Sequence, residues 1–266
     1  MFKPKTERIE LLAQLFPKVI EELESIFDKT SNVYIDWQNV LHWQEKIGWH
    51  FKLKRIKQFL DSFDTIKSIK IYTGTFEGNQ QSEDQIKEIR DSKYLLSTKP
   101  VKLMRISIDV SSVSDDSPAI LRSFIKKNFL AKLDIESIRY LNGKLAALNK
   151  QGISYIEELK CNFDVEIGRD MQRDFEADGV ENYILWSTDS DFADPIMQIK
   201  NDNKNAVIFA TSGKVAPELN ATGALVFDVK KVREFICFPR EIPQDIKNKI
   251  EDLKNAKGTP CGAPKQ

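Results

Sequence analysis

The chain has 266 residues, of which 41% are hydrophobic and 30% charged, and its 40 basic residues balance 40 acidic ones. This composition excludes a chain that is disordered throughout, and zero net charge excludes coating of nucleic acid through overall charge, so a nucleic-acid partner would need a local basic surface. No apolar run approaches the roughly 18 residues of a membrane-spanning helix, and the N-terminal MFKPKTERIE lacks a signal peptide's apolar stretch, so we expect a cytoplasmic protein with no membrane partner.

Two flanking segments are expected outside the main domain. Residues 1–30 form a leader helix, from Thr6 to about Lys29, whose apolar residues have mostly helical spacing and which Pro17 should kink. At the other end, the apolar content falls after Pro239. Residues 238–266 are expected to form a C-terminal helix and a loose tail, GTPCGAPKQ.

The main domain, residues 31–237, has the pattern of an α/β fold. Short apolar runs alternate with amphipathic stretches, which predicts a parallel sheet with crossover helices. The predicted strands are Val33–Ile35, Ile69–Tyr72, Tyr183–Trp186, Ala206–Phe209 and Leu225–Phe227. The predicted helices are Leu53–Ser62, Ser82–Tyr94, Asp164–Phe175, Phe192–Lys200 and Lys230–Ile236.

A less regular region, inserted at about residues 112–152, interrupts this pattern. Val101–Val110 should be extended, with Ile153–Lys160 as its hairpin partner. Between them, Ser117–Lys150 has apolar residues at the 3.6-residue helical period in two runs, which predicts an inserted helical hairpin. The two runs are Leu121, Phe124, Ile125 and Phe129, then Ile138, Leu141, Leu145 and Leu148.

The inserted hairpin is also rich in basic residues. Its acids are only Asp134 and Glu136, whereas the whole chain is neutral. This excess predicts an arm that grips a phosphate backbone, although an ordinary solvated helix face explains it equally well. The apolar stripes must be buried on the main domain or on a second copy, so a homodimer through the hairpin is a further expectation. The basic residues are Arg122, Lys126, Lys127, Lys132, Arg139, Lys144 and Lys150.

Acidic residues occur where an α/β sheet places its functional groups, at or just beyond strand ends. Asp36 ends the first apolar strand in NVYIDWQNV, and Asn39 follows one helical turn later. Both side chains can face the same point if the chain turns at once. A helix N-cap is the alternative role for Asp36.

Asp164 opens a predicted helix in KCNFDVEIGRDM. It shares a helical face with Ile167, Met171 and Phe175. Because an unpaired buried charge is costly, a carboxylate on this apolar stripe favours contact with a metal or substrate over a solvent-facing cap. The nearby residues Asp170 and Asp174 lie on other faces and should be solvated.

The densest acidic cluster follows the strand in YILWSTDSDFADPI. Asp189, Asp191 and Asp194 gather where a helix begins, and carboxylates so close repel one another unless a cation lies among them or they cap the helix. Their ligands are hard oxygens with no accompanying histidine or cysteine. Such a set suits Mg²⁺ or Mn²⁺ rather than zinc.

These motifs resemble the NYN domain in its LabA-like branch, which belongs to the PIN-like nuclease superfamily. The likeness spans about residues 32–237 apart from the inserted hairpin. Thr188, where many members have glycine, and the long insertion before Asp164 are departures from the family pattern. The motifs are NVYIDWQNV, the F-D-V-x-I-x-x-D-M pattern at Phe163–Met171, STDSDF and KNAVIFATSGKVAPEL.

The resemblance implies a PIN-like (Rossmann-like) fold with four or five parallel strands and cleavage of RNA that depends on Mg²⁺ or Mn²⁺. By motif position, Asp36, Asp164 and Asp189 would be metal ligands, and Asp191 would complete the cluster. Asn39 would orient a phosphate or water. Asp194 is a supporting candidate ligand, beyond the best-matched part of the motif.

Aromatic and basic residues near Asn39 are candidates for contact with RNA. We expect one of three tryptophans to be exposed near the site, where it could stack an unpaired base. The candidates for RNA binding are Trp37 and Trp43, with Trp49 as the third tryptophan, and the basic residues Lys54, Arg55, Lys126, Lys127 and Lys144.

The main alternative to a ribonuclease is a non-catalytic RNA-binding or regulatory module that retains the fold. The convergent acids favour catalysis, because a purely structural domain does not need them. A nucleotide phosphohydrolase of the haloacid-dehalogenase type would need an acid two residues after Asp36, where Gln38 stands. A two-histidine ribonuclease mechanism would have to recruit both His42 and His50 from one short segment, which disfavours it.

Overall fold

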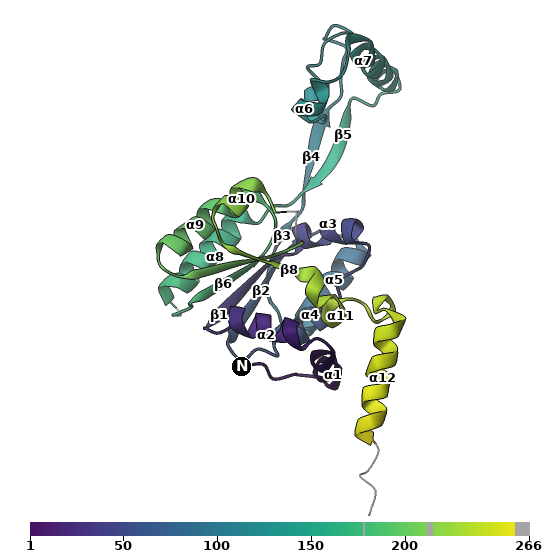
Figure 1. Ribbon diagram of the computed structural model, residues 1–266. Coiled ribbons are helices and arrows are strands. Elements are labelled where there is room, and N and C mark those ends of the chain that lie inside the picture. The colour runs from purple at the N-terminus through teal and green to yellow at the C-terminus, as the bar shows by residue number, and fades with distance from the viewer. Residues whose placement is uncertain (178, 212–214, 259–266) are drawn as a thin grey trace, which may run out of the picture. The chain divides into compact units, whose positions relative to one another are not determined.

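The structure is a computed structural model that describes residues 1–177, 179–211 and 215–258. It divides into two compact units (Figure 1). The sheet domain comprises Met1–Pro100 and the chain from Asn162 onward, and the insertion unit comprises Val101–Cys161. The insertion is wider than the expected residues 112–152 because it includes its own pair of strands. The leader segment belongs to the sheet domain.

A six-stranded parallel sheet forms the centre of the sheet domain. Its strands are β1 (Ser31–Asp36), β2 (Ile66–Thr75), β3 (Leu95–Pro100), β6 (Asn182–Trp186), β7 (Asn205–Ala210) and β8 (Leu225–Asp228). They lie in the order β3-β2-β1-β6-β7-β8, and every neighbouring pair is parallel. This confirms the α/β fold with a parallel sheet, but the expected four or five strands become six.

The extra strand is β3, at one edge of the sheet. None of its side chains is fully buried, whereas every residue of β1 and β6 is buried. A central parallel strand has to be apolar along its whole length because both of its faces are covered, but an edge strand does not. The sequence LLSTKP therefore lacks the continuous apolar run on which strand prediction depends.

Helices cover both faces of this sheet (Figure 1). One face carries α8 (Asp164–Ala177), α9 (Ala193–Asn201) and α10 (Pro217–Ala221), and the other carries α4 (Leu53–Leu60), α5 (Gln80–Asp91) and α11 (Arg233–Ile236). The remaining helices of the domain are α1 (Glu7–Leu15), α2 (Pro17–Ile26), α3 (Trp37–Ile47) and α12 (Gln244–Gly258). None of the helices in the described ranges has the length and apolarity needed to cross a bilayer. The predicted tail, residues 259–266, lies outside the described residues.

The leader is two helices, α1 and α2, and not one kinked helix. Pro17 is the first residue of α2, a position where its missing N–H costs no helical hydrogen bond. Ile9, Leu12 and Leu23 are fully buried. The Arg8 guanidinium donates to the carbonyl oxygen of Phe235 at 3.0 Å, so the leader is part of the packed domain.

A buried polar network ties α8 to the sheet. Asp174 is only 6% exposed, and Asp170 is half-buried. The prediction that both are solvated is therefore wrong, because side chains of β1 and β2 supply the donors that allow these carboxylates to lie against the sheet. The donors are Asn32 Nδ2 (2.7 Å), the Tyr34 hydroxyl (2.5 Å) and Lys70 Nζ (2.7 Å) to Asp174, and the Tyr72 hydroxyl (2.9 Å) to Asp170.

The insertion unit is built on the predicted hairpin. β4 (Lys102–Ser107) pairs with β5 (Tyr155–Lys160) in an antiparallel ladder. Of the two predicted helices only the second is formed, as α7 (Ile135–Lys150). The first is a 3₁₀ turn at Leu121–Ser123 followed by a single helical turn, α6 (Lys127–Leu130), because Lys126 is extended, with φ −56° and ψ 134°. The apolar spacing there reflects the burial of Leu121 and Leu130 on separate turns and not on one helix.

Candidate metal centre

The candidate site lies where the sheet changes direction. β1 and β6 are neighbours, and the chain leaves β1 toward β2 and β3 but leaves β6 toward β7 and β8. Ligands of open parallel sheets bind at the carboxyl ends of two such strands. Because Ile35 pairs with Trp186, the residues that follow, Asp36 and Ser187, leave the sheet at the same level.

Asp36 is buried at the end of β1, with 7% of its surface exposed. Its Oδ1 accepts a hydrogen bond from the Asn39 backbone N–H at 3.3 Å, so it caps α3, and its Oδ2 accepts from the Ser187 hydroxyl at 3.2 Å. The same hydroxyl accepts from the Asp189 backbone N–H at 3.3 Å. Ser187 therefore joins the two strand ends through one oxygen. Burial, with smaller contributions from Asp164 and Asp189, raises the pKa of Asp36 to about 6.

Three further carboxylates converge near these strand ends. One oxygen each from Asp164, Asp189 and Asp191 lies within 4.8 Å of those of the other two. Asp164 is the first residue of α8, and Asp189 caps the 3₁₀ turn Ser190–Phe192, with its side chain accepting from the Asp191 N–H at 3.3 Å. A helix start and a turn after β6 thus bring together acids that are 25 residues apart in the chain.

The electrostatic environment of this cluster is negative. Partial burial raises the pKa of Asp164, and the charges of Asp189 and Asp191 raise it as well. In the part of the chain that the structure describes, neither these three acids nor Asp36 forms an ion pair with lysine, arginine or histidine. Convergent carboxylates without a protein cation fit a bound divalent ion, and their oxygens suit Mg²⁺ or Mn²⁺.

Asn39 holds the turn after β6. Its side-chain oxygen accepts from the Thr188 N–H at 3.1 Å, the Thr188 hydroxyl at 3.0 Å and Trp43 Nε1 at 2.9 Å. The side-chain oxygen of Asn39 thus accepts from three donors, whereas its side-chain amide nitrogen has no hydrogen-bond partner among the described residues. Local sequence patterns cannot reveal this contact, because Asn39 and Thr188 are 149 residues apart in the chain.

Asp194 lies apart from the converging acids. It is exposed and lines a groove between α8 and α9 with Gly168, Met171 and Gln198. It is not one of the acids whose oxygens all lie within 4.8 Å of one another. It stands in the first turn of α9, where a negative charge is stabilised by the helix N-terminus.

The expectation of an exposed tryptophan beside the site is wrong. Trp37, Trp43 and Trp49 are 2%, 4% and 4% exposed, and the indole N–H of Trp43 is bonded to Asn39. They pack in the core because large aromatic rings contribute most when they are fully buried. Arg55 is half-buried, and its guanidinium donates to the Cys237 carbonyl at 2.9 Å, whereas Lys54 is exposed. RNA binding by these two residues stays a prediction.

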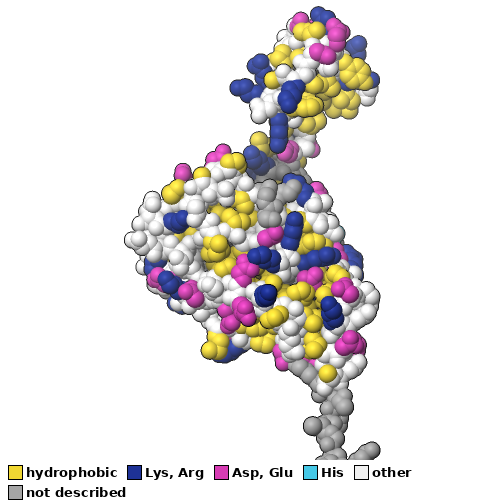
Figure 2. Space-filling model, in the orientation of Figure 1, with side chains coloured by type: hydrophobic (Ala, Val, Ile, Leu, Met, Phe, Trp, Pro, Cys, Tyr) yellow, Lys and Arg dark blue, Asp and Glu magenta, His cyan; other side chains and the backbone are white. Residues whose placement is uncertain are grey.

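The exposed aromatic residues lie elsewhere. Of the five phenylalanine and tyrosine residues that are strongly exposed in the described chain, all but Phe76 belong to the insertion unit. Figure 2 shows hydrophobic and basic side chains gathered together on the surface of that unit. The signal that sequence reasoning missed is the presence of aromatic residues among lysines and arginines. The four are Phe124 (39% exposed), Phe129 (59%), Tyr140 (64%) and Tyr155 (42%).

Comparison with known proteins adds little to this picture. No protein-family model matches the chain, and no curated protein sequence matches it. The solved structure of a protein of unknown function from Vibrio parahaemolyticus is similar, with 15% identity and a TM-score of 0.47 over 79% of this chain and 96% of that one. The likeness to NYN domains therefore rests on the sequence motifs alone. In the last of them, KNAVIFATSGKVAPEL, residues 212–214 lie outside the described residues.

The raised pKa of Asp36 leads to a prediction about stability. Because its pKa is higher in the folded protein (about 6) than the ordinary 3.8, the folded state holds the proton more tightly, and the free energy of unfolding falls as the pH rises from about 4 to 6 and stays lower above that. Asp36→Asn should therefore stabilise the protein at pH 8 by up to about 3 kcal/mol. The variant and parent should converge below pH 4.

Urea unfolding in the presence of a chelator checks this difference at both pH values. An asparagine can keep both contacts, since Ser187 Oγ can accept from its amide. If Asp36→Asn were less stable than the parent at pH 8, the ionised Asp36 carboxylate would not destabilise the folded protein, and the prediction would be wrong.

Proposed function

We propose that the protein is a metal-dependent ribonuclease that hydrolyses RNA phosphodiester bonds at the carboxyl ends of β1 and β6. The observation that carries this proposal is the convergence of three carboxylates within 4.8 Å at the switch point of the sheet. A Mg²⁺ or Mn²⁺ ion would supply an activated water and relieve the charge on the phosphate when bound there.

The residues at the site would divide the work. Asp164, Asp189 and Asp191 would hold the ion. Asp36, expected from the motif to be a ligand, is buried and is not one of the acids whose oxygens converge within 4.8 Å, so it would add to the negative potential of the site and hold the turn through Ser187. Asn39 would keep the Thr188 turn in place through its side-chain oxygen and offer its amide nitrogen to a phosphate.

RNA is proposed as the substrate because the motifs resemble those of NYN nucleases and because exposed aromatic and basic residues occur together on the insertion unit. A haloacid-dehalogenase mechanism finds no support, since Gln38 donates to the Thr73 hydroxyl at 3.2 Å at the position where a second acid would be needed. A homodimer through the insertion unit stays a prediction.

Two measurements test the function. Purified protein should cleave an end-labelled single-stranded RNA in Mg²⁺ or Mn²⁺ and stop when EDTA is added. Electron paramagnetic resonance of free Mn²⁺ should show binding to the parent and an affinity at least about tenfold lower for Asp191→Asn, since each ligand supplies charge to the ion. Mn²⁺ binding without cleavage, together with RNA binding in EDTA, would favour the non-catalytic RNA-binding module.

A further inference from the structure

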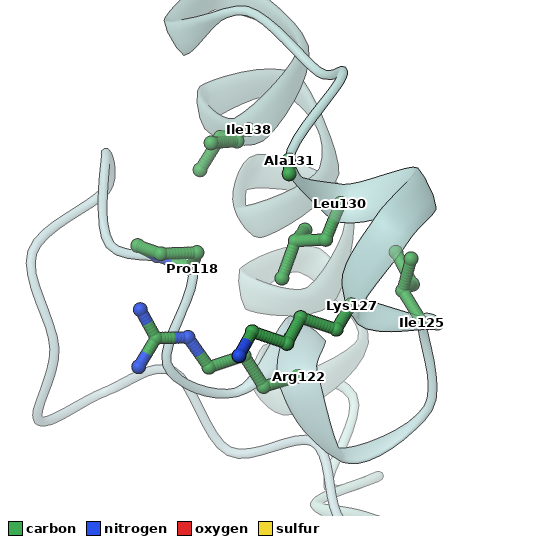
Figure 3. Close-up of a pocket in the computed structure, with 7 residues that line it drawn as sticks. All are labelled: Pro118, Arg122, Ile125, Lys127, Leu130, Ala131 and Ile138. Carbon is green, nitrogen blue, oxygen red and sulfur yellow. The ribbon is translucent and has the colours of Figure 1, made fainter.

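The insertion unit contains a cavity that the candidate metal centre does not use. Its volume is about 680 Å³, within the range of ligand-binding clefts. It lies between the segment around the short helix α6 and the side of α7 (Figure 3). The residues that line it are Pro118, Arg122, Ile125, Lys127, Leu130, Ala131 and Ile138.

The lining combines apolar side chains with two cations. Pro118, Leu130 and Ile138 form an apolar wall, while Arg122 and Lys127 extend along the same side of the pocket in Figure 3. Neither cation has a side-chain hydrogen bond or ion pair among the described residues, and no acid lines the cavity. Two exposed cations beside an apolar cleft fit a ligand with an anionic end and an apolar body.

Hydrogen bonds and buried side chains of the insertion unit hold the walls of the pocket in place. Asn142 of α7 is 2% exposed, and its amide nitrogen donates to the carbonyl oxygens of Asp115 at 2.7 Å and Ser117 at 2.8 Å. These bonds hold the chain next to Pro118 against α7. The buried side chains of Leu121 and Leu130 anchor the other wall.

We infer that this pocket binds a nucleotide unit of single-stranded RNA, with a phosphate on Arg122 and Lys127 and a base against the apolar wall. This inference rests on the proposed function, for which it supplies a substrate-holding site. The exposed rings of Phe124, Phe129 and Tyr140 lie in the same unit and offer stacking surfaces to neighbouring bases, which an acidic peptide would not need. Lys126 and Lys144, expected from the sequence to bind RNA, do not line the pocket.

The test measures binding separately from cleavage. Fluorescence anisotropy of a labelled 12-nucleotide oligouridine is recorded in EDTA for the full-length protein, for Arg122→Gln/Lys127→Gln and for the control Lys150→Gln/Lys160→Gln. The control pair is exposed, lies in the same unit, removes the same charge and does not line the pocket. The pocket variant should lose at least about tenfold in affinity, and its log K against log salt should flatten by about 1.4, as expected for two phosphate contacts on a single strand. The control should stay close to the parent.

Methyl-labelled NMR spectra show whether the cavity itself is occupied. Oligouridine should shift the methyl resonances of Ile125, Leu130 and Ile138 and leave those of Ile9 and Leu12 unchanged. Inorganic phosphate should shift Ile125 and Ile138 far less. Equal losses in the two double variants would overturn the inference, as would methyl shifts produced equally by an oligoglutamate peptide.

The outcomes also separate this inference from the proposed function. Pocket-dependent RNA binding by a protein that does not cleave in Mg²⁺ or Mn²⁺ supports the pocket and removes the ribonuclease. Metal-dependent cleavage by the parent, together with an unchanged RNA affinity of Arg122→Gln/Lys127→Gln, would contradict the pocket inference and leave the proposed ribonuclease function standing.

Discussion

Asp189→Asn should abolish metal-dependent RNA cleavage while the fold survives. The substitution neutralises one of three converging carboxylates, and because changes to mere supporting residues of metal sites already cost 10–100-fold, loss of a direct ligand should cost at least about a hundredfold. Stability should hold or rise, since the change relieves repulsion with Asp164 and Asp36, whose pKa values Asp189 raises. Initial cleavage rates and a thermal unfolding curve measure the two effects.

The matched control for this experiment is Asp194→Asn. It makes the same chemical change five residues away, on an exposed side chain in the groove between α8 and α9. It should cleave RNA at the parent rate. If purified Asp189→Asn protein also cleaves as fast as the parent, the activity comes from a contaminant or from another site.

Asp174→Ala should produce the largest loss of stability. It removes the acceptor of Asn32, Tyr34 and Lys70 and leaves the Lys70 ammonium, whose side chain is 17% exposed, without its partner. Breaking a buried ion pair from one side costs about 3–5 kcal/mol. Urea unfolding in EDTA measures this loss independently of any metal.

A second variant separates charge from packing at this position. Lys70→Met combined with Asp174→Leu removes both charges and should recover most of the lost free energy of unfolding, because an apolar pair of similar volume often replaces a buried ion pair without cost. A double variant as unstable as Asp174→Ala would show that the hydrogen bonds of Tyr34 and Asn32 matter more than the uncompensated charge.

The elements of the fold that could be predicted are those that a single local pattern, such as a continuous apolar run, identifies. β1 and β6 are buried on both faces, so their apolar runs stand out, and the acids that follow them lie at strand ends for the same reason. The antiparallel pairing of β4 with β5 was also accessible, because both runs flank one inserted segment. Edge strand β3, with its half-exposed and polar residues, could not be recognised in this way.

The missed features depend on partners that are distant in the chain. The prediction of a solvated Asp174 assigns it to another helical face than Ile167 and Met171, but its offsets of seven and three residues from them place it on their buried face. Tyr34 and Lys70 make its burial possible, and they are 140 and 104 residues away. The tryptophans of α3 were misjudged for a related reason: an aromatic residue beside a polar one can face either way until the rest of the core is placed.

The ladder between β4 and β5 gives the insertion unit a particular topology. Lys102 and Lys160 are directly paired, so the chain returns, after 57 intervening residues, to within roughly 5 Å of the point where it departed. The insertion unit therefore connects β3 to α8 as a tight turn would, because the chain enters and leaves the unit at neighbouring points. A change in the length or sequence of the insertion unit therefore need not shift the register of any strand of the parallel sheet, so the insertion unit and the sheet domain can diverge at different rates.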